Sequence, residues 1–305
     1  MADWNPGFTS AQFRLDGKRA LITGGRGALA EAMAATLADL GCAVALASRT
    51  EADCADLAAG IAERFGVPAV GLSCNIADEA SVEAVVAGTI DRLGGLDILI
   101  NNAGASWWGL PQDIPLKGWQ KVMDVNVKGL FFLTQKLMPL LRKAASADSP
   151  ARVINIASID GMHTSPMSGF AYGTSKAAVI HLTRFMGAHL AGEHILCNGI
   201  APGPVDTQGA GSRLWGTDEA RASIAAKLPM GRFGTEAEIA DVVRQIKYVV
   251  DVGGIDVVGR MRRQPGAQQR RDQDDAYEPR SQRSGPSNGT HPGGSSERLH
   301  TPTSP

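Results

Sequence analysis

The sequence has little that would place the chain in a membrane or on nucleic acid. No apolar run reaches the length of about 18 residues that a spanning helix needs, and no basic segment followed by an apolar run opens the chain. The formal net charge is −1 over 305 residues, so no overall charge attracts polyanions or acidic lipid surfaces. We therefore expect a cytoplasmic protein that binds neither membranes nor nucleic acid.

Cysteine and histidine are also too scattered for a metal site. The four cysteines lack the short paired spacing of zinc ligands. Three of them, Cys42, Cys74 and Cys197, lie in or beside apolar runs, which favours core packing. None of the six histidines has a ligand spacing such as H-E-x-x-H. A metal cofactor has no support in this sequence.

What the sequence does contain is a regular alternation of short apolar runs and helical patterns. At 44% hydrophobic residues, the chain can bury a large core. Strands are predicted over 19–24, 43–50, 69–74, 96–104, 151–158 and within 193–207, and helices over about 25–41, 51–65, 79–93, 116–145, from 170 onward and over 236–250. This alternation implies right-handed crossovers and an α/β fold built on a parallel sheet.

A glycine-rich turn lies between the first predicted strand and the helix that follows it. Small residues let phosphates approach the backbone, and a helix amino terminus offers unpaired N–H groups and a partial positive charge. Strand, glycine turn and helix are therefore typical of a diphosphate site. The candidate cofactor residues here are Gly24, Arg26, Gly27 and Leu29.

The second predicted strand ends in Ser48 and Arg49, where such a fold holds the adenosine ribose. An acidic residue would bind a free 2′-hydroxyl at this point, whereas a hydroxyl and a guanidinium suit a 2′-phosphate. Arg26 offers a second cation from the glycine turn. The pattern favours NADP(H) over NAD(H); the alternative is that Arg49 only caps an exposed strand end.

Two further strand ends carry asparagines. Asn75, followed by Ile76, suits either a hydrogen bond to the adenine edge or an ordinary turn. Asn102, Ala103 and Gly104 end the fourth strand, where small residues let the backbone approach a flat ring and an amide can tie neighbouring strands together. All five are candidate cofactor residues.

The stretch from 154 to 183 combines a hydroxyl, a phenol and an ammonium. Ser158 ends the fifth strand, while Tyr172 and Lys176 stand four residues apart in a helical pattern and so share a face. A nearby ammonium, helped by an oxidised nicotinamide, favours the phenolate and lowers its pKa from about 10 toward neutral pH. Ser158 would hydrogen-bond the substrate oxygen while Tyr172 gives or takes its proton.

Two other features stand out. Asn126 lies between valines in a helical pattern, where an amide competes with backbone hydrogen bonds. It suits either a buried structural amide or a kink that holds a water beside Lys176. Trp107 and Trp108 are adjacent in a loop and cannot both face one core, so at least one should line a pocket or an interface.

A Pro-Gly turn follows the sixth predicted strand. The residues placed to contact a nicotinamide carboxamide and a diphosphate are Pro202, Gly203, Val205 and Thr207. Residues 208–230 are glycine-rich and then amphipathic. They are long enough to act as a lid over substrate.

Taken in order, these motifs resemble the short-chain dehydrogenase/reductase family over about residues 15–245. The resemblance rests on the T-G turn, NNAG at 101–104, Asn126, Ser158, Tyr172-x-x-x-Lys176 and Pro202-Gly203. It implies a Rossmann-type doubly wound parallel sheet with helices on both faces. It also implies a homo-oligomer.

The resemblance also implies roles for the residues. Tyr172 would be the proton donor, Ser158 would orient a carbonyl, Lys176 would activate the phenol and bind the ribose, and Asn126 would hold a relay water. Residues 118–129 and 145–161 are similar to NADPH-dependent 3-oxoacyl reductases. The implied reaction is hydride transfer between NADP(H) and a ketone or secondary alcohol, with a small-molecule substrate. The alternatives are a sugar-acid or alcohol dehydrogenase, and a nucleotide-binding protein of this fold with impaired catalysis.

The glycine turn departs from the pattern of the family. That turn usually reads T-G-x-x-x-G-x-G, and here Ala28 and Ala30 stand at its last two glycine positions. A methyl group at 30 is tolerable for helix packing. A methyl group at 28 would crowd the phosphates unless Gly27 takes over part of the turn.

The carboxyl-terminal region departs from it as well. We divide the chain into a lead-in (1–17), a Rossmann-fold domain (18–259) and a polar tail (260–305) whose composition predicts disorder. The candidate for a last sheet strand lies within 248–259 and carries two glycines, which weaken a central strand. We therefore expect a weakened sheet edge and oligomer. The change in composition fits either a genuine extension or a misread gene end.

Overall fold

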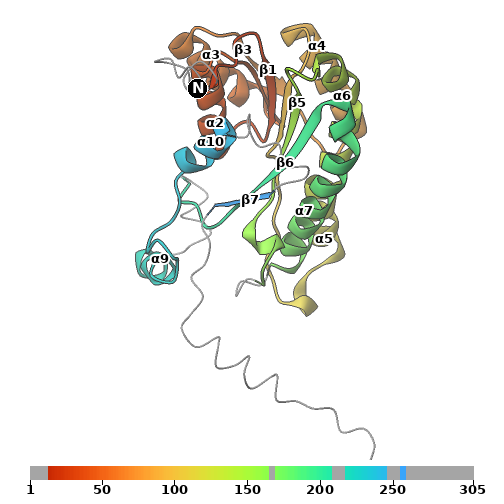
Figure 1. The fold of residues 1–305 in the computed structure, drawn as a ribbon. Coiled ribbons are helices and arrows are strands. Elements are labelled where there is room, and N and C mark those ends of the chain that lie inside the picture. The colour runs from red at the N-terminus through yellow and green to blue at the C-terminus, as the bar shows by residue number, and fades with distance from the viewer. Residues whose placement is uncertain (1–12, 165–168, 208–216, 246–254, 259–305) are drawn as a thin grey trace, which may run out of the picture. The chain divides into compact units, whose positions relative to one another are not determined.

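The computed structural model describes residues 13–164, 169–207, 217–245 and 255–258. Within those residues, seven strands form one parallel sheet in the order β3-β2-β1-β4-β5-β6-β7 (Figure 1). The strands are β1 (Arg19–Thr23), β2 (Ala43–Ser48), β3 (Ala69–Ser73), β4 (Ile98–Asn101), β5 (Ala151–Ile156), β6 (Ile195–Pro202) and β7 (Ile255–Val258). The predicted doubly wound α/β fold is confirmed.

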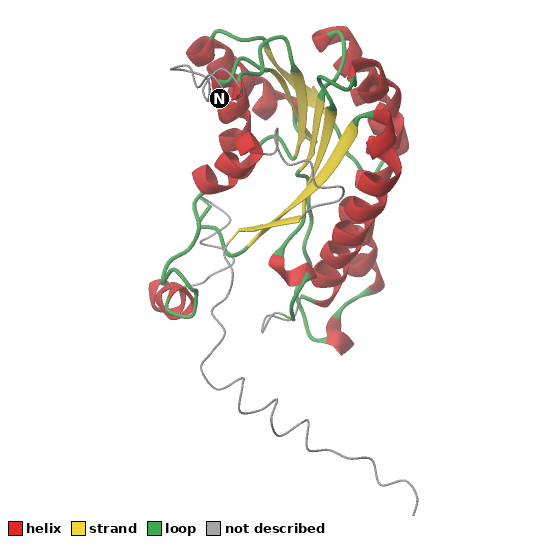
Figure 2. Cartoon of the chain, in the orientation of Figure 1, coloured by secondary structure: helices red, strands yellow, loops and turns green. Residues whose placement is uncertain are grey.

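Helices cover both faces of the sheet (Figure 2). On one face lie α2 (Ala28–Asp39), α3 (Glu51–Phe65) and α10 (Glu236–Gln245); on the other lie α4 (Glu79–Leu93), α6 (Leu130–Ala144) and α7 (Phe170–Leu190). Successive strand residues supply the two cores, so that Ile22 belongs to the first and Leu21 to the second. Because the strands are buried on both faces, their sequences read as continuous apolar runs.

The order of the strands determines where a ligand can bind. The chain builds outward from β1 through β2 and β3, and then returns to add β4 on the other side of β1. In open parallel sheets, this reversal creates a crevice beyond the carboxyl ends of the strands. At these ends lie Thr23 of β1 and Asn101 of β4. We therefore expect a ligand to bind beyond these strand ends, beside the glycine turn and the NNAG segment.

The helix predicted over 116–145 is present but contains an irregular turn. α5 (Leu116–Met123) passes through a π-helical turn, η2 (Asp124–Gly129), into α6. Gly129 at the end of this turn lies against Ile76, so that an added Cβ would stand 2.6 Å from the Ile76 Cγ1. Such turns insert an extra residue into a helix, and this one lets the helix pass close to the loop after β3.

The structure describes less of the carboxyl-terminal part. α10 is described as far as Gln245. Residues 246–250 of the predicted helix lie outside the described residues, as do residues 1–12 of the lead-in and the tail from 260 to 305. β7 pairs with β6 from Gly199↔Ile255 to Pro202↔Val258, within the stretch predicted for the last strand. The oligomer and its weakening stay predictions. In the described part, no helix is long and apolar enough to cross a membrane.

Two glycines of the α3 region should respond oppositely to alanine. At Gly71 in β3, an added Cβ would lie 2.6 Å from the Ala55 Cα, whereas at Gly60, exposed in α3, it would meet nothing within 4 Å. We expect Gly71→Ala to lower the free energy of unfolding by about 1–3 kcal/mol through overpacking. Gly60→Ala should raise it by about 0.5–1 kcal/mol. Urea unfolding of both variants checks this, and an unchanged Gly71→Ala protein would contradict the close packing of α3 on β3.

Candidate active site

Ser158 stands just beyond the carboxyl end of β5, at the amino end of the short 3-10 helix η3 (Ile159–Gly161). Its backbone is extended, and its hydroxyl accepts a hydrogen bond from the Asp160 N–H at 3.1 Å. The side chain is buried, with 8% of its surface exposed. This arrangement fixes the hydroxyl at the edge of the sheet where a ligand would bind.

Tyr172 and Lys176 lie one turn apart on α7 and share a face, as predicted. The Lys176 Nζ is 5.6 Å from the centroid of the Tyr172 ring and donates a hydrogen bond of 2.7 Å to the carbonyl of Ile156 at the end of β5. The Tyr172 phenol is hydrogen-bonded to Ser158. The structure therefore brings hydroxyl, phenol and ammonium together.

α7 can approach β5 this closely because the loop between them contains a glycine. An added Cβ at Gly161 would stand 2.5 Å from the Lys176 carbonyl carbon and 2.6 Å from the Ala177 nitrogen. No side chain fits there without moving the backbone. Gly161 is thus a residue of the site that motif reasoning missed, and its place three residues after Ser158 was the signal available in the sequence.

Burial controls the ionisation of the two α7 groups. It raises the pKa of Tyr172 to about 12, while the hydrogen bond with Ser158 acts in the opposite direction. It also lowers the pKa of Lys176 to about 8. The predicted fall of the Tyr172 pKa toward neutral is wrong for the protein by itself, because the loss of water around the phenolate outweighs the favourable contacts.

Asp160 was not singled out from the sequence, although it lies two residues after Ser158. Burial raises the pKa of its carboxyl group. When ionised, this carboxylate also raises the pKa of Tyr172, since two nearby negative charges repel. Asp160 therefore acts on the Tyr172 pKa in the direction opposite to the hydrogen bond with Ser158.

Asn126 lies in the π-helical turn and is buried, with 1% of its surface exposed. Its Oδ1 accepts from the Ala105 N–H at 2.7 Å, and its Nδ2 donates to the Ala105 carbonyl at 2.9 Å and to the Ser175 hydroxyl at 2.8 Å. Ser175 in turn donates to the Tyr172 carbonyl at 2.7 Å. The structural amide and the helix irregularity, left as alternatives by the sequence, are both present, and the amide ties the segment after β4 to α7. The relay water stays a prediction.

The glycine turn after β1 suits a diphosphate. Gly24 has a φ of +68°, which favours glycine, and Gly27 stands directly before α2 and has no side chain that could cap its first turn. The first-turn N–H groups, which include that of Leu29, have no acceptor within the helix. Ala28 is the first residue of α2 and Ala30 packs in the core, so both methyl groups belong to an ordinary helix while the glycines before them form the turn.

The NNAG segment is bound to this turn. The Asn102 side chain donates to the carbonyl of Thr23 at 3.0 Å, and the N–H groups of Asn102 and Ala103 both contact the Thr23 hydroxyl at 3.0 Å. The structure therefore ties β4 to β1 as the sequence suggested. At Gly104, an added Cβ would stand 3.7 Å from the Asn126 Oδ1 and 3.9 Å from the Lys176 Nζ, which places this glycine between the two.

The end of β2 only partly follows expectation. The Ser48 hydroxyl donates to the Thr50 carbonyl at 3.0 Å and contacts the Cys54 thiol at 3.1 Å, so it closes the turn into α3. The expectation that Ser48 would bind a 2′-phosphate is not supported, because its hydroxyl is buried and already bonded. Arg49 is exposed. Arg26 pairs with Asp53 of α3, with 3.1 Å between Nη1 and Oδ2.

Asn75 behaves as a turn residue. Its Oδ1 accepts from the Ala77 N–H at 3.3 Å, and its own N–H donates to the Ser81 hydroxyl at 2.8 Å. Ile76 beside it is buried in the core next to α4 and α6. Of the two roles left open for Asn75, the structure shows the turn.

Beyond β6, the chain runs along the same edge of the sheet. Pro202 ends β6, Gly203 follows it, and Val205 forms a bridge with Gly234. The Thr207 N–H donates to the Val205 carbonyl at 3.2 Å. Of the predicted lid, residues 208–216 lie outside the described residues, whereas α9 (Asp218–Ala225) is an exposed helix.

The two adjacent tryptophans face different surroundings, as predicted. Trp107 packs on α5, where an added Cβ at Gly118 would stand 2.7 Å from its Cε2. Trp108 lies against Tyr172, with 5.6 Å between the ring centroids, and covers Gly169, where an added Cβ would be 3.0 Å from its Cε3. Trp108 is therefore the member of the pair that lines the site.

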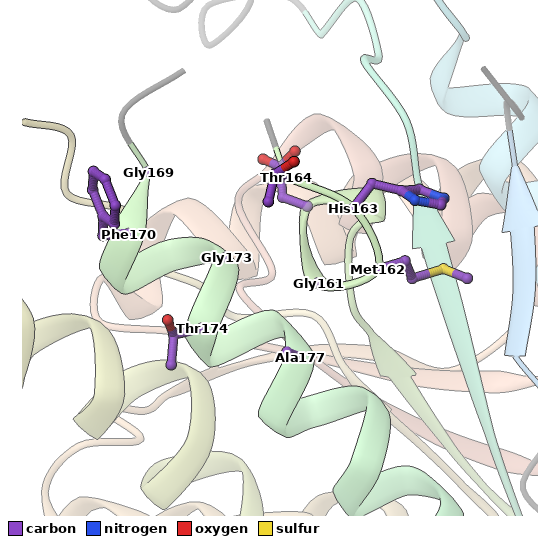
Figure 3. Close-up of a pocket in the computed structure, with 10 residues that line it drawn as sticks. Gly161, Met162, His163, Thr164, Gly169, Phe170, Gly173, Thr174 and Ala177 are labelled. Carbon is purple, nitrogen blue, oxygen red and sulfur yellow. The ribbon is translucent and has the colours of Figure 1, made fainter. Parts of the chain in front are cut away.

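A cavity of about 540 Å³ lies beside the site, between the loop after β5 and the first turns of α7. Figure 3 shows Gly169 at the start of α7 and Gly173 and Thr174 within it, with the side chains of Met162 and His163 extending from the loop away from that helix. Residues 165–168, between loop and helix, lie outside the described residues. In the described part of the chain, no group of three or more His, Cys, Asp or Glu side chains could hold a metal ion.

The chain is similar in sequence and in fold to known proteins. The family model described as enoyl-(acyl carrier protein) reductase matches residues 25–246. The rhamnolipids biosynthesis 3-oxoacyl-[acyl-carrier-protein] reductase of Pseudomonas aeruginosa is 37% identical over 228 residues, 75% of this chain and 88% of that protein. The 2-(S)-hydroxypropyl-CoM dehydrogenase 3 of Xanthobacter autotrophicus is 33% identical over 75% of this chain and 89% of that protein. A solved Pseudomonas aeruginosa RhlG/NADP active-site complex has a TM-score of 0.76 at 35% identity, covering 81% of this chain and 96% of that one.

The buried Lys176 should leave a signature in the pH dependence of stability. Its pKa of about 8 in the folded chain lies below the unfolded value of about 10.4, so between these values the unfolded chain binds more protons and stability rises with pH. Lys176→Met removes this titration. We expect the unfolding free energy of the unsubstituted protein, relative to the variant, to grow by about 1.4 kcal/mol per pH unit from about pH 8 to 10.

Urea unfolding at several pH values measures this difference. Tyr172 and the buried thiols titrate in both proteins and so cancel in the comparison. A difference that stays constant over this range would show that Lys176 has an ordinary pKa and is not buried as described.

Proposed function

The chain belongs to the short-chain dehydrogenase/reductase family, and we propose that it is an NADP(H)-dependent reductase of 3-oxoacyl-type carbonyl compounds. At the coarser level, it is an oxidoreductase of this family acting on CH–OH groups. The observation that carries the proposal is the convergence of Ser158, Tyr172 and Lys176 at the edge of the sheet that also holds the glycine turn.

The proposed chemistry starts from the hydrogen bond between Ser158 and Tyr172. Ser158 orients the carbonyl oxygen of the substrate, and Tyr172 donates the proton that converts it to a hydroxyl. NADPH would supply the hydride, and its oxidised ring would add a positive charge beside the phenol. Because burial, with a smaller contribution from Asp160, raises the Tyr172 pKa to about 12, the residue is protonated at neutral pH and ready to donate in the direction of reduction.

Lys176 has two roles in this proposal. Its ammonium, fixed by the Ile156 carbonyl at 2.7 Å, stabilises the phenolate that remains after proton transfer and can contact a ribose hydroxyl. Asn126 keeps α7 in place through Ser175. The π-helical turn around Asn126 would hold the water that returns a proton through Lys176 to Tyr172.

The choice of NADP(H) rests on the charges around the end of β2. Arg49 is exposed directly after this strand, and Arg26 lies in the neighbouring glycine turn. Two guanidinium groups suit a 2′-phosphate better than a free hydroxyl. The similar Pseudomonas aeruginosa structure is an NADP complex, which supports the same choice.

The choice of a 3-oxoacyl substrate rests on the relatives and on Trp108. Two kinds of relative act on different compounds according to their names, a 3-oxoacyl-[acyl-carrier-protein] and a hydroxypropyl-CoM. Both names describe an oxygen-bearing carbon in a compound joined to a larger carrier. Trp108 provides an apolar wall beside Tyr172, which suits the chain of such a compound.

Loss of the Tyr172 hydroxyl should separate chemistry from binding. We expect Tyr172→Phe to lower kcat for NADPH-dependent reduction by about 10²–10⁴-fold while changing the Kd of NADPH little, because the ring and its packing remain. Loss of NADPH absorbance with 3-oxoacyl thioesters, simple ketones and keto-sugar acids measures the rate, and calorimetry the binding. NADPH binding without turnover in the unsubstituted protein would favour a protein with impaired catalysis, and substantial activity in Tyr172→Phe would remove the assignment of Tyr172.

Arg49 should matter for one cofactor only. We expect Arg49→Ala to weaken NADP+ binding by roughly 10- to 100-fold, since hydrogen bonds to charged groups contribute about 1.5–3 kcal/mol, and to leave NAD+ binding within a factor of about two. Calorimetric titration with both nucleotides checks this. Equal losses of NADP+ and NAD+ affinity would show that Arg49 does not bind the 2′-phosphate and only caps an exposed strand end.

A further inference from the structure

Arg26 forms an ion pair with Asp53, so a ligand that binds its guanidinium group must share that group with a carboxylate. Its Nη1 lies 3.1 Å from the Oδ2 of Asp53, and the two side chains expose 62% and 43% of their surface. Asp53 is the third residue of α3, in the first turn of that helix. An acid in this position also complements the helix dipole, so a purely structural role must be tested alongside any other.

The pair stands where the adenosine end of a dinucleotide would lie. The glycine turn is bound to β2 by the Gly25 N–H, which donates to the Ala47 carbonyl at 3.0 Å. An added Cβ at Gly25 would stand 2.8 Å from the Ala47 nitrogen, so turn and strand touch. Arg26 in the turn, Arg49 after β2 and Asp53 in α3 thus gather around one strand end.

We propose that Asp53 is a specificity-determining residue that limits the discrimination between NADP(H) and NAD(H). Its carboxylate occupies the guanidinium of Arg26, so a 2′-phosphate must compete for that cation. The carboxylate also places a negative charge close to a group that carries about two negative charges itself. A free 2′-hydroxyl meets neither penalty. The inference rests on the proposed use of NADP(H).

The size of the effect follows from the exposure of the pair. Exposed ion pairs are worth about 1.4- to 5-fold in an equilibrium constant, and repulsion between the carboxylate and a phosphate adds to the loss of the shared cation. We therefore expect Asp53→Asn to tighten NADP+ binding about three- to tenfold at low salt. Binding of NAD+ should change by less than about twofold.

The test compares Asp53→Asn with a matched control. Glu63→Gln removes the same charge from the last turn of α3, about 15 Å along the helix and beyond the screening length of about 8 Å at physiological salt. The Kd of NADP+, NAD+ and 2′,5′-ADP is measured by calorimetry at about 20 and 300 mM salt. The inference expects the NADP+ to NAD+ ratio to shift in Asp53→Asn only, with the shift shrinking at high salt. A ratio that moves equally in both variants, or in neither, overturns it.

A double variant identifies the route of the effect. In Arg26→Gln, the gain from Asp53→Asn should fall by at least half if the carboxylate acts by occupying Arg26. If Asp53→Asn tightened NADP+ binding by the same factor in the Arg26→Gln variant, the carboxylate would not act by competing for Arg26. Thermal unfolding reports the structural role separately, since the helix dipole affects stability but not the ratio of the two affinities.

The proposed cofactor and this inference can fail independently. If the unsubstituted protein prefers NADP+ and Asp53→Asn leaves that preference unchanged, only the role of Asp53 is lost. If the unsubstituted protein binds both nucleotides equally, the proposed preference is lost. In that case Asp53→Asn still decides the inference, which stands if a preference for NADP+ emerges and falls if it does not.

Discussion

The hydrogen bond from the buried ammonium of Lys176 to the carbonyl of Ile156 is the interaction on which the site depends. A lysine with 5% of its surface exposed loses most of its hydration, and a single carbonyl at 2.7 Å replaces only part of it. The lowered pKa of Lys176, about 8, reflects the part of the lost hydration that this hydrogen bond does not replace. The fold tolerates this because α7 is held against β5 on several sides: Gly161 allows the close approach, Asn126 ties α7 to the segment after β4, and Tyr172 covers the ammonium.

The same removal of water acts on Lys176 and Tyr172 in opposite senses. Burial destabilises the charged form of each, so the phenol keeps its proton more strongly and the ammonium holds its proton less strongly. Burial therefore sets the difference between the pKa values of Tyr172 and Lys176 before any ligand binds. Ser158 and Asp160, which lie two residues apart on one loop, shift the Tyr172 pKa in opposite directions. Ser158 lowers it through a hydrogen bond, and Asp160 raises it through its charge.

The edge of the sheet where we propose that the nucleotide binds is built on a different principle. There the glycine turn and the NNAG segment provide backbone groups and small side chains, and the Thr23 hydroxyl binds two N–H groups across the strands. Charged side chains lie at the outer end, where Arg26 of the glycine turn, Arg49 after β2 and Asp53 of α3 are exposed to water. The inner polar groups are held by hydrogen bonds between the strands. The outer charged side chains form only an exposed ion pair, which is weak, so substitutions there can change specificity at little cost in stability.

The sequence by itself determined the order of the strands and helices, the shared face of Tyr172 and Lys176, and the position of Ser158 at a strand end. These follow from local periodicity, in which residues four apart on a helix are neighbours and apolar runs form strands whatever lies elsewhere in the chain. The tertiary structure alone decided which polar groups were already bonded. Ser48 and Asn75 each form hydrogen bonds that close a turn, and Asn126 is bonded to Ala105 and Ser175. Arg26 pairs with Asp53, which lies 27 positions further along the chain in α3. It also decided the sign of the Tyr172 pKa shift, because burial is a property of the packed chain and cannot be read from the spacing of a motif.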